Sequence, residues 1–378
     1  MADPPPPSPE TINIRAPINL NAASTFSIKF RSDGPTDAYT VLTTDAALRG
    51  ISNMSGKYVL GADIDTNPSM WTPIGTDMAP FAGLFDGLGH TVSNIHRDNG
   101  NESNVGMFGS IDFSGSVRNL KLANVNVAGL NNVGALAGQN SGFIYGVSSS
   151  GTVTGRDTLA ATNDDIVVAI GGLAGFNQGT IAESSSSVNV TAVSGDQSMF
   201  AGTGSSGGIG GLVGVHVGPP SGLINVFATG SVSGLNNVGG LVGYADSGIA
   251  FAYSTGAVSN NGSGGSFGGL VGAVGPIISS APGLFVETYW DTTTSGQSTS
   301  ASTAFNQSTG YTTTQMQTAS NFPTWDPSVW TVANLSYPGL RALGVGGGGG
   351  GGGGVQSIII TYNSATRVYG DTSDPAFS

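Results

Sequence analysis

The 378-residue chain contains no cysteine, which excludes disulfides, thiolate metal sites and cysteine nucleophiles. Charged residues make up only 9% of it, against roughly 25% in an ordinary globular domain. The 23 acidic and 11 basic residues give a formal net charge of -12, which disfavours binding to nucleic acids or to anionic membrane surfaces. Solubility must therefore rest on the hydroxyl and amide side chains of Ser, Thr and Asn.

Long apolar runs are also missing: no stretch approaches the roughly 18 residues of a membrane-spanning helix, so membrane insertion is not expected. The start of the chain, MADPPPPSPE, lacks the basic and apolar regions of a signal peptide, and residues 1–10 are predicted to be a Pro-rich disordered start. We therefore expect an internal piece of a larger protein. No window shows a helical period with capping residues, so the fold class is expected to be all-β.

Glycine, by contrast, occupies 62 positions and recurs in one motif, an apolar residue followed by Gly. Six copies start at Val105, Val133, Ile170, Ile209, Val238 and Phe267, as in VGALAG and VGGLVG. The starts lie 28, 37, 39, 29 and 29 residues apart, which defines a unit of about 28 residues with insertions in the two longer intervals. The candidate structural positions of the repeat are Gly106, Gly134, Gly171, Gly210, Gly239, Gly268, Leu136, Leu173, Leu212, Leu241 and Leu270.

Each unit continues with a polar turn, a short apolar alternation and a β-branched piece such as GTVTG, which indicates strands of four to six residues. Such a unit cannot bury its apolar face alone, so successive units are predicted to stack into a right-handed parallel β-helix, or β-solenoid. Stacking places equivalent residues about 4.8 Å apart, where Asn, Ser and Thr hydrogen-bond and like charges repel. The glycines are expected at corners with positive φ or where neighbouring backbones come close.

The composition changes along the chain and predicts further parts. Residues 11–40 are predicted to be a β-helical rung, and residues 41–287 the repeat solenoid. Residues 288–345 are rich in aromatic residues and are predicted to cap the last coil. The nine glycines at 346–354 would form a linker, and residues 355–378 the truncated start of another β module.

Several segments together carry a family resemblance: GKYVLGADID, WTPIG, FDGLGHTVSNI, the repeated GGLVG, and the closing YWDTTTSGQ, TTTQMQ and YPGLR. They resemble the GLUG-motif repeats of large secreted bacterial adhesins of the filamentous-haemagglutinin type. The tail ITYNSATRVYGDTSDPAF looks like the start of an MBG-type domain. The resemblance implies a non-enzymatic protein, secreted or at the bacterial cell surface, exported by two-partner secretion or a similar route. It brings no catalytic residue and no cofactor.

The candidate phosphate and metal sites each have a simpler structural explanation. A phosphate-binding glycine loop needs a helix after it and an acid at a fixed distance, and the six copies offer neither, so the glycines are interpreted as structural. Asp63, Asp65 and Asn67 imitate half of an EF-hand loop and are weak Ca²⁺ candidates, although a solvated strand end is the preferred interpretation. Asp77 and Asp86 could add ligands for a cation only if folding brought them together.

The three histidines are candidate metal ligands, and the aromatic residues of the predicted cap are candidate sugar platforms. His90 and His96 would share one strand face if the strand were continuous, but no third metal ligand is apparent, and His216 stands alone. The aromatic residues of the predicted cap could stack on sugars, although packing is the preferred interpretation; they are Tyr289, Trp290, Trp325 and Trp330.

Three functions stay open at this point. The first is a structural and adhesive segment that binds a host glycan, an extracellular matrix or a neighbouring cell surface, with insertions at 155–169 and 194–208 as contact loops. The second is a carbohydrate-active lyase or glycosidase using Asp164 and Asp165, which the shortage of basic residues disfavours. The third is a passive spacer.

Overall fold

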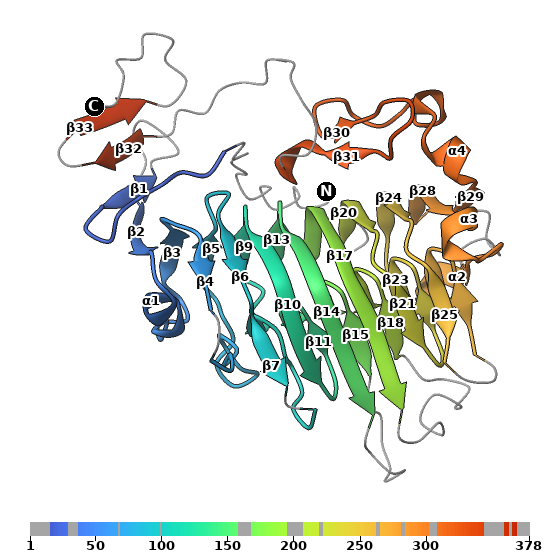
Figure 1. Ribbon diagram of the computed structural model, residues 1–378, viewed down its shortest axis with the longest axis horizontal. Coiled ribbons are helices and arrows are strands. Elements are labelled where there is room, and N and C mark those ends of the chain that lie inside the picture. The colour runs from blue at the N-terminus through green and yellow to red at the C-terminus, as the bar shows by residue number, and fades with distance from the viewer. Residues whose placement is uncertain are drawn as a thin grey trace, which may run out of the picture.

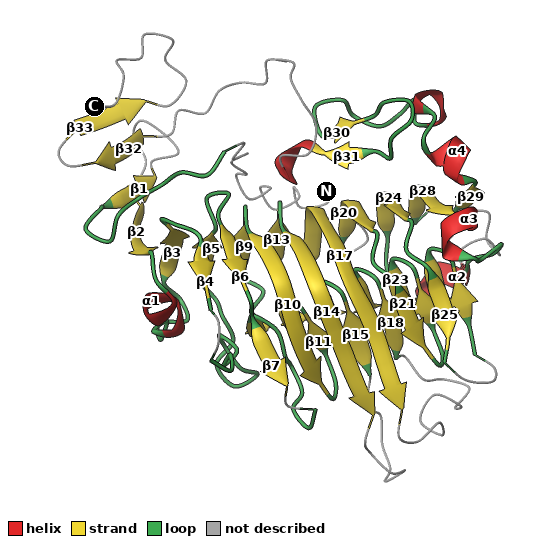
Figure 2. Ribbon diagram, in the orientation of Figure 1, coloured by secondary structure: helices red, strands yellow, loops and turns green. Residues whose placement is uncertain are grey.

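The computed structural model describes residues 16–28, 37–66, 69–98, 100–157, 168–194, 207–218, 222–261, 265–280, 284–301, 308–343, 359–362 and 365–368. Within these ranges the chain is all-β, with strands of two to 15 residues and a few helices of three to five residues (Figures 1 and 2). The predicted Pro-rich start and Gly linker lie outside the described residues, as do Asn67, Asp164 and Asp165.

The largest sheet has 18 strands, and all its pairs are parallel except that β1 (Phe26–Ile28) runs antiparallel to β2. Its long strands lie side by side in Figure 1. The other members are β2 (Asp37–Leu42), β3 (Lys57–Leu60), β4 (Ile64–Asp65), β5 (Leu84–Asp86), β6 (Thr91–Ser93), β7 (His96–Asp98), β9 (Ser116–Arg118), β10 (Lys121–Gly129), β13 (Phe143–Tyr145), β14 (Ser148–Asp157), β17 (Thr180–Ser194), β20 (Leu223–Ala228), β21 (Val232–Gly234), β24 (Ile249–Ser254), β25 (Val258–Asn260), β28 (Phe285–Asp291) and β29 (Thr309–Tyr311).

The Gly motif forms two further parallel sheets. One has five strands, β11 (Val133–Gly134), β15 (Ala169–Gly171), β18 (Gly208–Gly210), β22 (Val238–Gly239) and β26 (Phe267–Gly268). The other has six, β8 (Phe108–Ile111), β12 (Ala137–Asn140), β16 (Ala174–Asn177), β19 (Val213–His216), β23 (Val242–Ala245) and β27 (Val271–Val274). The prediction of an all-β chain with parallel sheets is therefore confirmed, and the arrangement is β-helix-like.

Equivalent motif positions pair directly with one another. Val133 lies opposite Ile170, Ile170 opposite Ile209, and the series continues through Val238 to Phe267. The two longer intervals keep this register because their extra residues fall between strands, after β14 and after β17. The spacing of the motif in the sequence is thus the spacing of neighbouring strands.

The motif leucines form a continuous column in the core. Each backbone N–H donates to the carbonyl of the next leucine, from Leu136 to Leu173, Leu212, Leu241 and Leu270. All five side chains are fully buried. Burial of a leucine is worth about 1.5–3 kcal/mol, so this column is a main source of stability and explains why the position is kept in each copy.

The motif glycines are required for space, and the expectation of positive φ is wrong for them. None of the six lies in the left-handed region. A Cβ at Gly171 or Gly239 would stand 2.0 Å from a carbonyl oxygen three residues on, and at the second motif glycine, Gly240, it would stand 2.1 Å from the Gly269 oxygen. Close approach of backbones, the other half of the prediction, is what the structure has.

Asparagine is the commonest residue with a side chain at the left-handed corners of the described chain, although Glu183, Phe251 and Glu287 also take such corners. Seven asparagines of the described ranges have φ between 50 and 62°, at positions 94, 104, 119, 124, 132, 225 and 237. Asn adopts this conformation more readily than other residues with a side chain, because its amide can hydrogen-bond locally. The high Asn content therefore has a conformational reason as well as the stacking reason inferred from the sequence.

Short helices and hairpins fill the connections, which the sequence analysis did not predict. The helices are α1 (Asp45–Arg49), α2 (Pro276–Ser280), α3 (Thr292–Ser295) and α4 (Thr313–Met316), with 3-10 turns η3 (Ala319–Asn321) and η4 (Arg341–Leu343). The hairpins are β30 (Trp330–Thr331) with β31 (Gly339–Leu340) and β32 (Ile359–Tyr362) with β33 (Ala365–Val368). Local caps account for the helices: Thr44 caps α1, and Thr312 with Gln315 forms a capping box on α4.

Candidate functional site

The two described cation candidates act as hydrogen-bond acceptors for neighbouring coils. Asp63 Oδ1 accepts from the Thr91 backbone N–H at 2.9 Å and lies 3.0 Å from His90 Nδ1. The Thr91 bond, aided by His90, holds the pKa of Asp63 below its usual range. Asp65 Oδ1 accepts from Asn94 Nδ2 at 2.8 Å. Among the described residues, no three His, Asp or Glu side chains gather in a way that could hold a metal ion.

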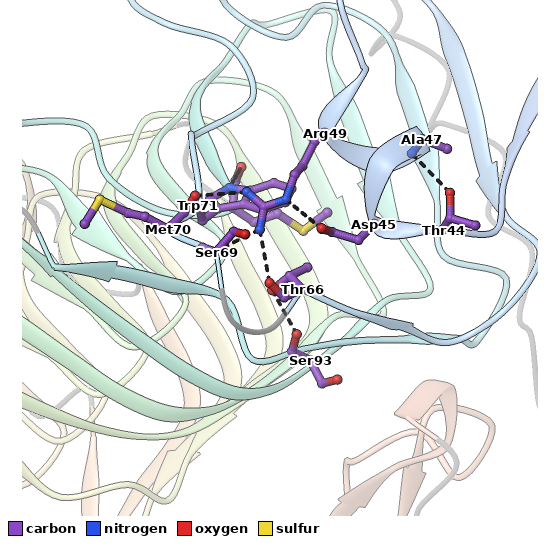
Figure 3. Close-up of polar contacts among 10 residues, drawn as sticks. Thr44, Asp45, Ala47, Arg49, Thr66, Ser69, Met70, Trp71 and Ser93 are labelled. Carbon is purple, nitrogen blue, oxygen red and sulfur yellow. Dashed lines mark hydrogen bonds and ion pairs between the residues drawn. The ribbon is translucent and has the colours of Figure 1, made fainter.

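The guanidinium group of Arg49 binds backbone carbonyl oxygens that follow Asp65 in the sequence (Figure 3). Arg49 donates to three carbonyl oxygens, those of Met70 (2.9 Å), Thr66 (3.1 Å) and Ser69 (3.1 Å). It also pairs with Asp45 at 2.8 Å and lies over the Trp71 ring, 4.9 Å from its centroid. Arg49 therefore supplies these oxygens with the positive charge that a bound cation would otherwise supply. It also fixes the WTPIG segment to α1.

The other predicted carboxylates are also bound within the fold. Asp86 is buried and pairs with Arg118 at 2.7 Å, while its second oxygen accepts from Asn119 Nδ2 at 3.1 Å and from the Leu88 backbone. Asp77 accepts from Asn104 on the following coil. Folding therefore brings each to its own partners and does not bring them together.

The histidines do not share a strand face. Asn94, with φ of 62°, interrupts the strand between β6 and β7, so the condition for a common face is not met. His90 is buried, with Nδ1 against Asp63 and Nε2 3.0 Å from the Ile18 carbonyl oxygen. His96 lies in β7, opposite Asn126 of β10.

His216 ends a buried amide ladder. Asn140 Nδ2 donates to Asn177 Oδ1 at 2.7 Å, and Asn177 Nδ2 lies 3.0 Å from His216 Nδ1. His216 Nε2 is 3.3 Å from the Gly248 carbonyl oxygen. The ring is fully buried, and this burial lowers its pKa to about 4, so it is neutral at pH 7.

The aromatic residues proposed as possible sugar platforms are packed in cores. Trp290 is buried against the Gly motif of the last coil, where a Cβ on Gly269 would meet its ring. Tyr289, Trp325 and Trp330 belong to a second buried cluster, which the segment 308–343 forms over the aromatic column of β20, β24 and β28. These rings are all less than a tenth exposed, so packing is their role in this structure.

A buried carboxylate attaches the segment 308–343 to the coils. Asp291 Oδ1 caps α3 by accepting from the Thr293 and Thr294 backbones. Its Oδ2 accepts from Thr313 Oγ1 at 2.7 Å and from the Tyr337 hydroxyl at 2.6 Å. This segment reaches coils far away in sequence, since Trp330 Nε1 donates to Asn225 Oδ1 across 105 positions. Sequence reasoning missed this contact, which has no local signal.

The most regular exposed feature is the outer surface of β10, β14, β17, β21 and the β25 region, which we call the long-strand face. In each of its five coils two residues flank a buried valine, as in Thr152-Val153-Thr154, and all of these flanking residues except the buried Ala128 are at least partly exposed. The coils align in register. The first column is Asn126, Thr152, Asn189, Ser231 and Ala257, and the second is Ala128, Thr154, Thr191, Ser233 and Ser259.

Two neighbouring features border the long-strand face. β14 and β17 run directly into the two insertions predicted as contact loops, most of whose residues lie outside the described part of the chain. On the amino-terminal side, His96 and Asp98 of β7 follow the same two columns. The face could have been found in the sequence by aligning the closing pieces TVT, NVT and SVS, which share one offset from the valine.

Comparisons with known proteins support a β-rich fold. No family model matches the chain. It is 36% identical over 164 residues to Halomucin from Haloquadratum walsbyi, an alignment that covers 39% of this chain but only 2% of that protein's length. No helix among the described residues is both long and apolar enough to cross a membrane. The chain is also similar to the crystal structure of a candidate immunoglobulin A1 protease from Bacteroides ovatus, with a TM-score of 0.57, 20% identity and coverage of 81% of this chain and 93% of that one. At that level of identity, the likeness is one of fold alone.

Proposed function

We propose that this chain is a structural and adhesive segment of a large secreted or cell-surface protein. The observation that carries the proposal is the in-register stacking of the Gly motif, which builds a rigid body from repeats with little charge. The similarity to Halomucin, a far longer protein, supports the same assignment. Such a rigid body suits a non-enzymatic role, in which the protein presents a surface for binding.

Within this proposal, the repeats close into a right-handed solenoid of the GLUG type, as in adhesins of the filamentous-haemagglutinin kind. Three parallel sheets in register and the usual right-handed crossover of parallel strands support this. Residues 11–40 serve as the first rung, 288–345 as the cap, and 355–378 as the start of an MBG-type module. The partners proposed are a glycan, a matrix or a neighbouring cell surface, with export through a separate partner protein.

The proposal can be tested on intact cells that produce the full-length parent protein. Antibodies raised against this chain should label such cells without permeabilisation, and external protease should remove the signal. Beads coated with the chain should adhere to glycan-bearing surfaces more than beads coated with albumin. A parent confined to the cell interior contradicts the proposal, and surface exposure without adhesion reduces the function to a passive spacer.

A further inference from the structure

The long-strand face is rigid and periodic in two directions. Neighbouring coils are about 4.8 Å apart, and outward residues two positions apart on one strand are separated by about 6.6 Å. The valines between them, such as Val153 and Val190, are buried and hold each strand in register. Threonine is stiff at χ1, so its hydroxyl points in a fixed direction. Binding would therefore require little further ordering of the protein.

The two columns of the face offer hydrogen bonds and no charge. The ten residues of the two columns are Asn, Thr, Ser or Ala, in a chain whose net charge is -12. Thr152 Oγ1 donates to Asn126 Oδ1 at 3.2 Å, and Ser231 Oγ donates to Asn189 Oδ1 at 2.9 Å. These bonds between coils use the amide oxygens, which leaves the amide nitrogens of Asn126 and Asn189 to donate to a ligand. A ligand matched to this surface is neutral and rich in hydroxyl groups.

We infer that the long-strand face binds an extended, neutral β-1,4-linked polysaccharide that lies across the strands, with one sugar for each coil. Such a glycan repeats its sugar rings at nearly the spacing of strands in a sheet, so each ring can lie over the two columns of one coil. Successive rings are turned over, so the hydroxyls of opposite ring edges meet a given column in alternation. Nucleic acids and acidic glycans lack any cationic partner in these columns. Because five coils lie in a row, the weak contacts of each coil add together along one glycan chain. The inference rests on the proposed adhesive function and names its ligand.

The test measures sedimentation of the full chain with microcrystalline cellulose, a neutral β-1,4-linked glucan. The native chain should sediment with cellulose but not with an α-linked dextran gel. Binding should persist at about 1 M sodium chloride, where the screening length is only about 3 Å. No sedimentation with cellulose, equal binding to dextran, or loss of binding in salt each overturns the inference.

Variants locate the contact. The triple variant Asn126→Ala, Thr152→Val, Asn189→Ala should bind cellulose about tenfold more weakly or worse, because several hydrogen bonds are lost together. Thr152→Arg keeps an exposed polar residue and should block a flat ligand, which provides a second variant if the triple variant folds poorly. The matched control is Thr72→Val with Thr314→Val, two exposed threonines outside the face.

The outcomes separate this inference from the proposed function. Native binding by the control together with loss of binding in both face variants supports the inference. If the face variants bind cellulose like the native chain, the inference is wrong, whatever the result on intact cells. If the native chain adheres to cells but not to cellulose, the adhesive function stands and the ligand assignment falls.

Discussion

Acidification should destabilise the fold through His216, because the structure holds this imidazole neutral. The ring lies between the Asn177 amide and the Gly248 carbonyl with no exposed surface, and burial lowers its pKa to about 4. In an unfolded chain the pKa of histidine is about 6.5. Between these values the unfolded chain binds a proton that the folded chain does not. The stabilisation is therefore complete above about pH 6.5 and is lost as the pH falls toward about 4.

The magnitude follows from the same two pKa values. Their difference corresponds to about 3 kcal/mol of unfolding free energy, most of it lost by about pH 4.5. The variant His216→Asn removes the titrating group and places at 216 the residue found at the paired positions 140 and 177. Other groups titrate equally in both proteins, so the difference between them isolates His216.

Urea unfolding at about pH 7.5 and about pH 4.5 measures the effect. The native chain should lose about 2–3 kcal/mol more unfolding free energy over this interval than His216→Asn does. Equal losses in the two proteins would refute the reasoning, because His216 would then have the same pKa in both states. A proton NMR titration of the folded chain gives an independent reading, in which His216 should show no transition near pH 6.5.

Three further perturbations test the packing. Gly240→Ala should lower the unfolding free energy by about 2–3 kcal/mol and with it the melting temperature, because its Cβ would meet the Gly269 oxygen. The control Gly50→Ala, where the nearest atom to the new Cβ is 3.2 Å away, should change the melting temperature little. Arg49→Lys should lower the unfolding free energy, measured in urea, by about 2 kcal/mol, because the carbonyl bonds of Figure 3 are lost. Lys57→Ala, which removes a surface pair with Asp37, should lower it by less than about 1 kcal/mol. Asp291→Asn should speed hydrogen exchange in residues 309–343 while β14 and β17 keep their protection, and uniform exchange across both regions would contradict the role given to Asp291.

The repeating part of the fold could be predicted because every copy carries the same information. The spacing of VGALAG and VGGLVG gave the strand neighbours directly, and Leu173 or Leu212 was recognisable as a core position from its place in the motif. The reason for the glycines was only half right. A positive φ and a backbone contact both call for Gly, and only the three-dimensional packing separates them.

The parts of the fold that do not repeat were less predictable, because they depend on contacts between residues far apart in sequence. Nothing near Arg49 indicates that it binds carbonyls some 20 residues on, and nothing near Trp330 points to Asn225. The long-strand face was overlooked for a different reason. Acids, histidines and aromatic rings stand out in a sequence as candidate site residues, whereas the columns of this face consist of Asn, Thr, Ser and Ala, which are ordinary polar and small residues of strands.

The direction of two amide ladders explains the positions of Asp65 and Asp77. Asn124 donates to Asn94, which donates to Asp65, and at another corner Asn132 donates to Asn104, which donates to Asp77. A carboxylate only accepts, so it can end such a ladder but cannot pass it on. A second carboxylate in the same column would lie about 4.8 Å from the first and repel it. In these two columns aspartate therefore stands at the amino-terminal end and neutral asparagine follows it on the later coils, whereas Asp291, an acid of a late coil, accepts from hydroxyl and backbone donors outside such a ladder.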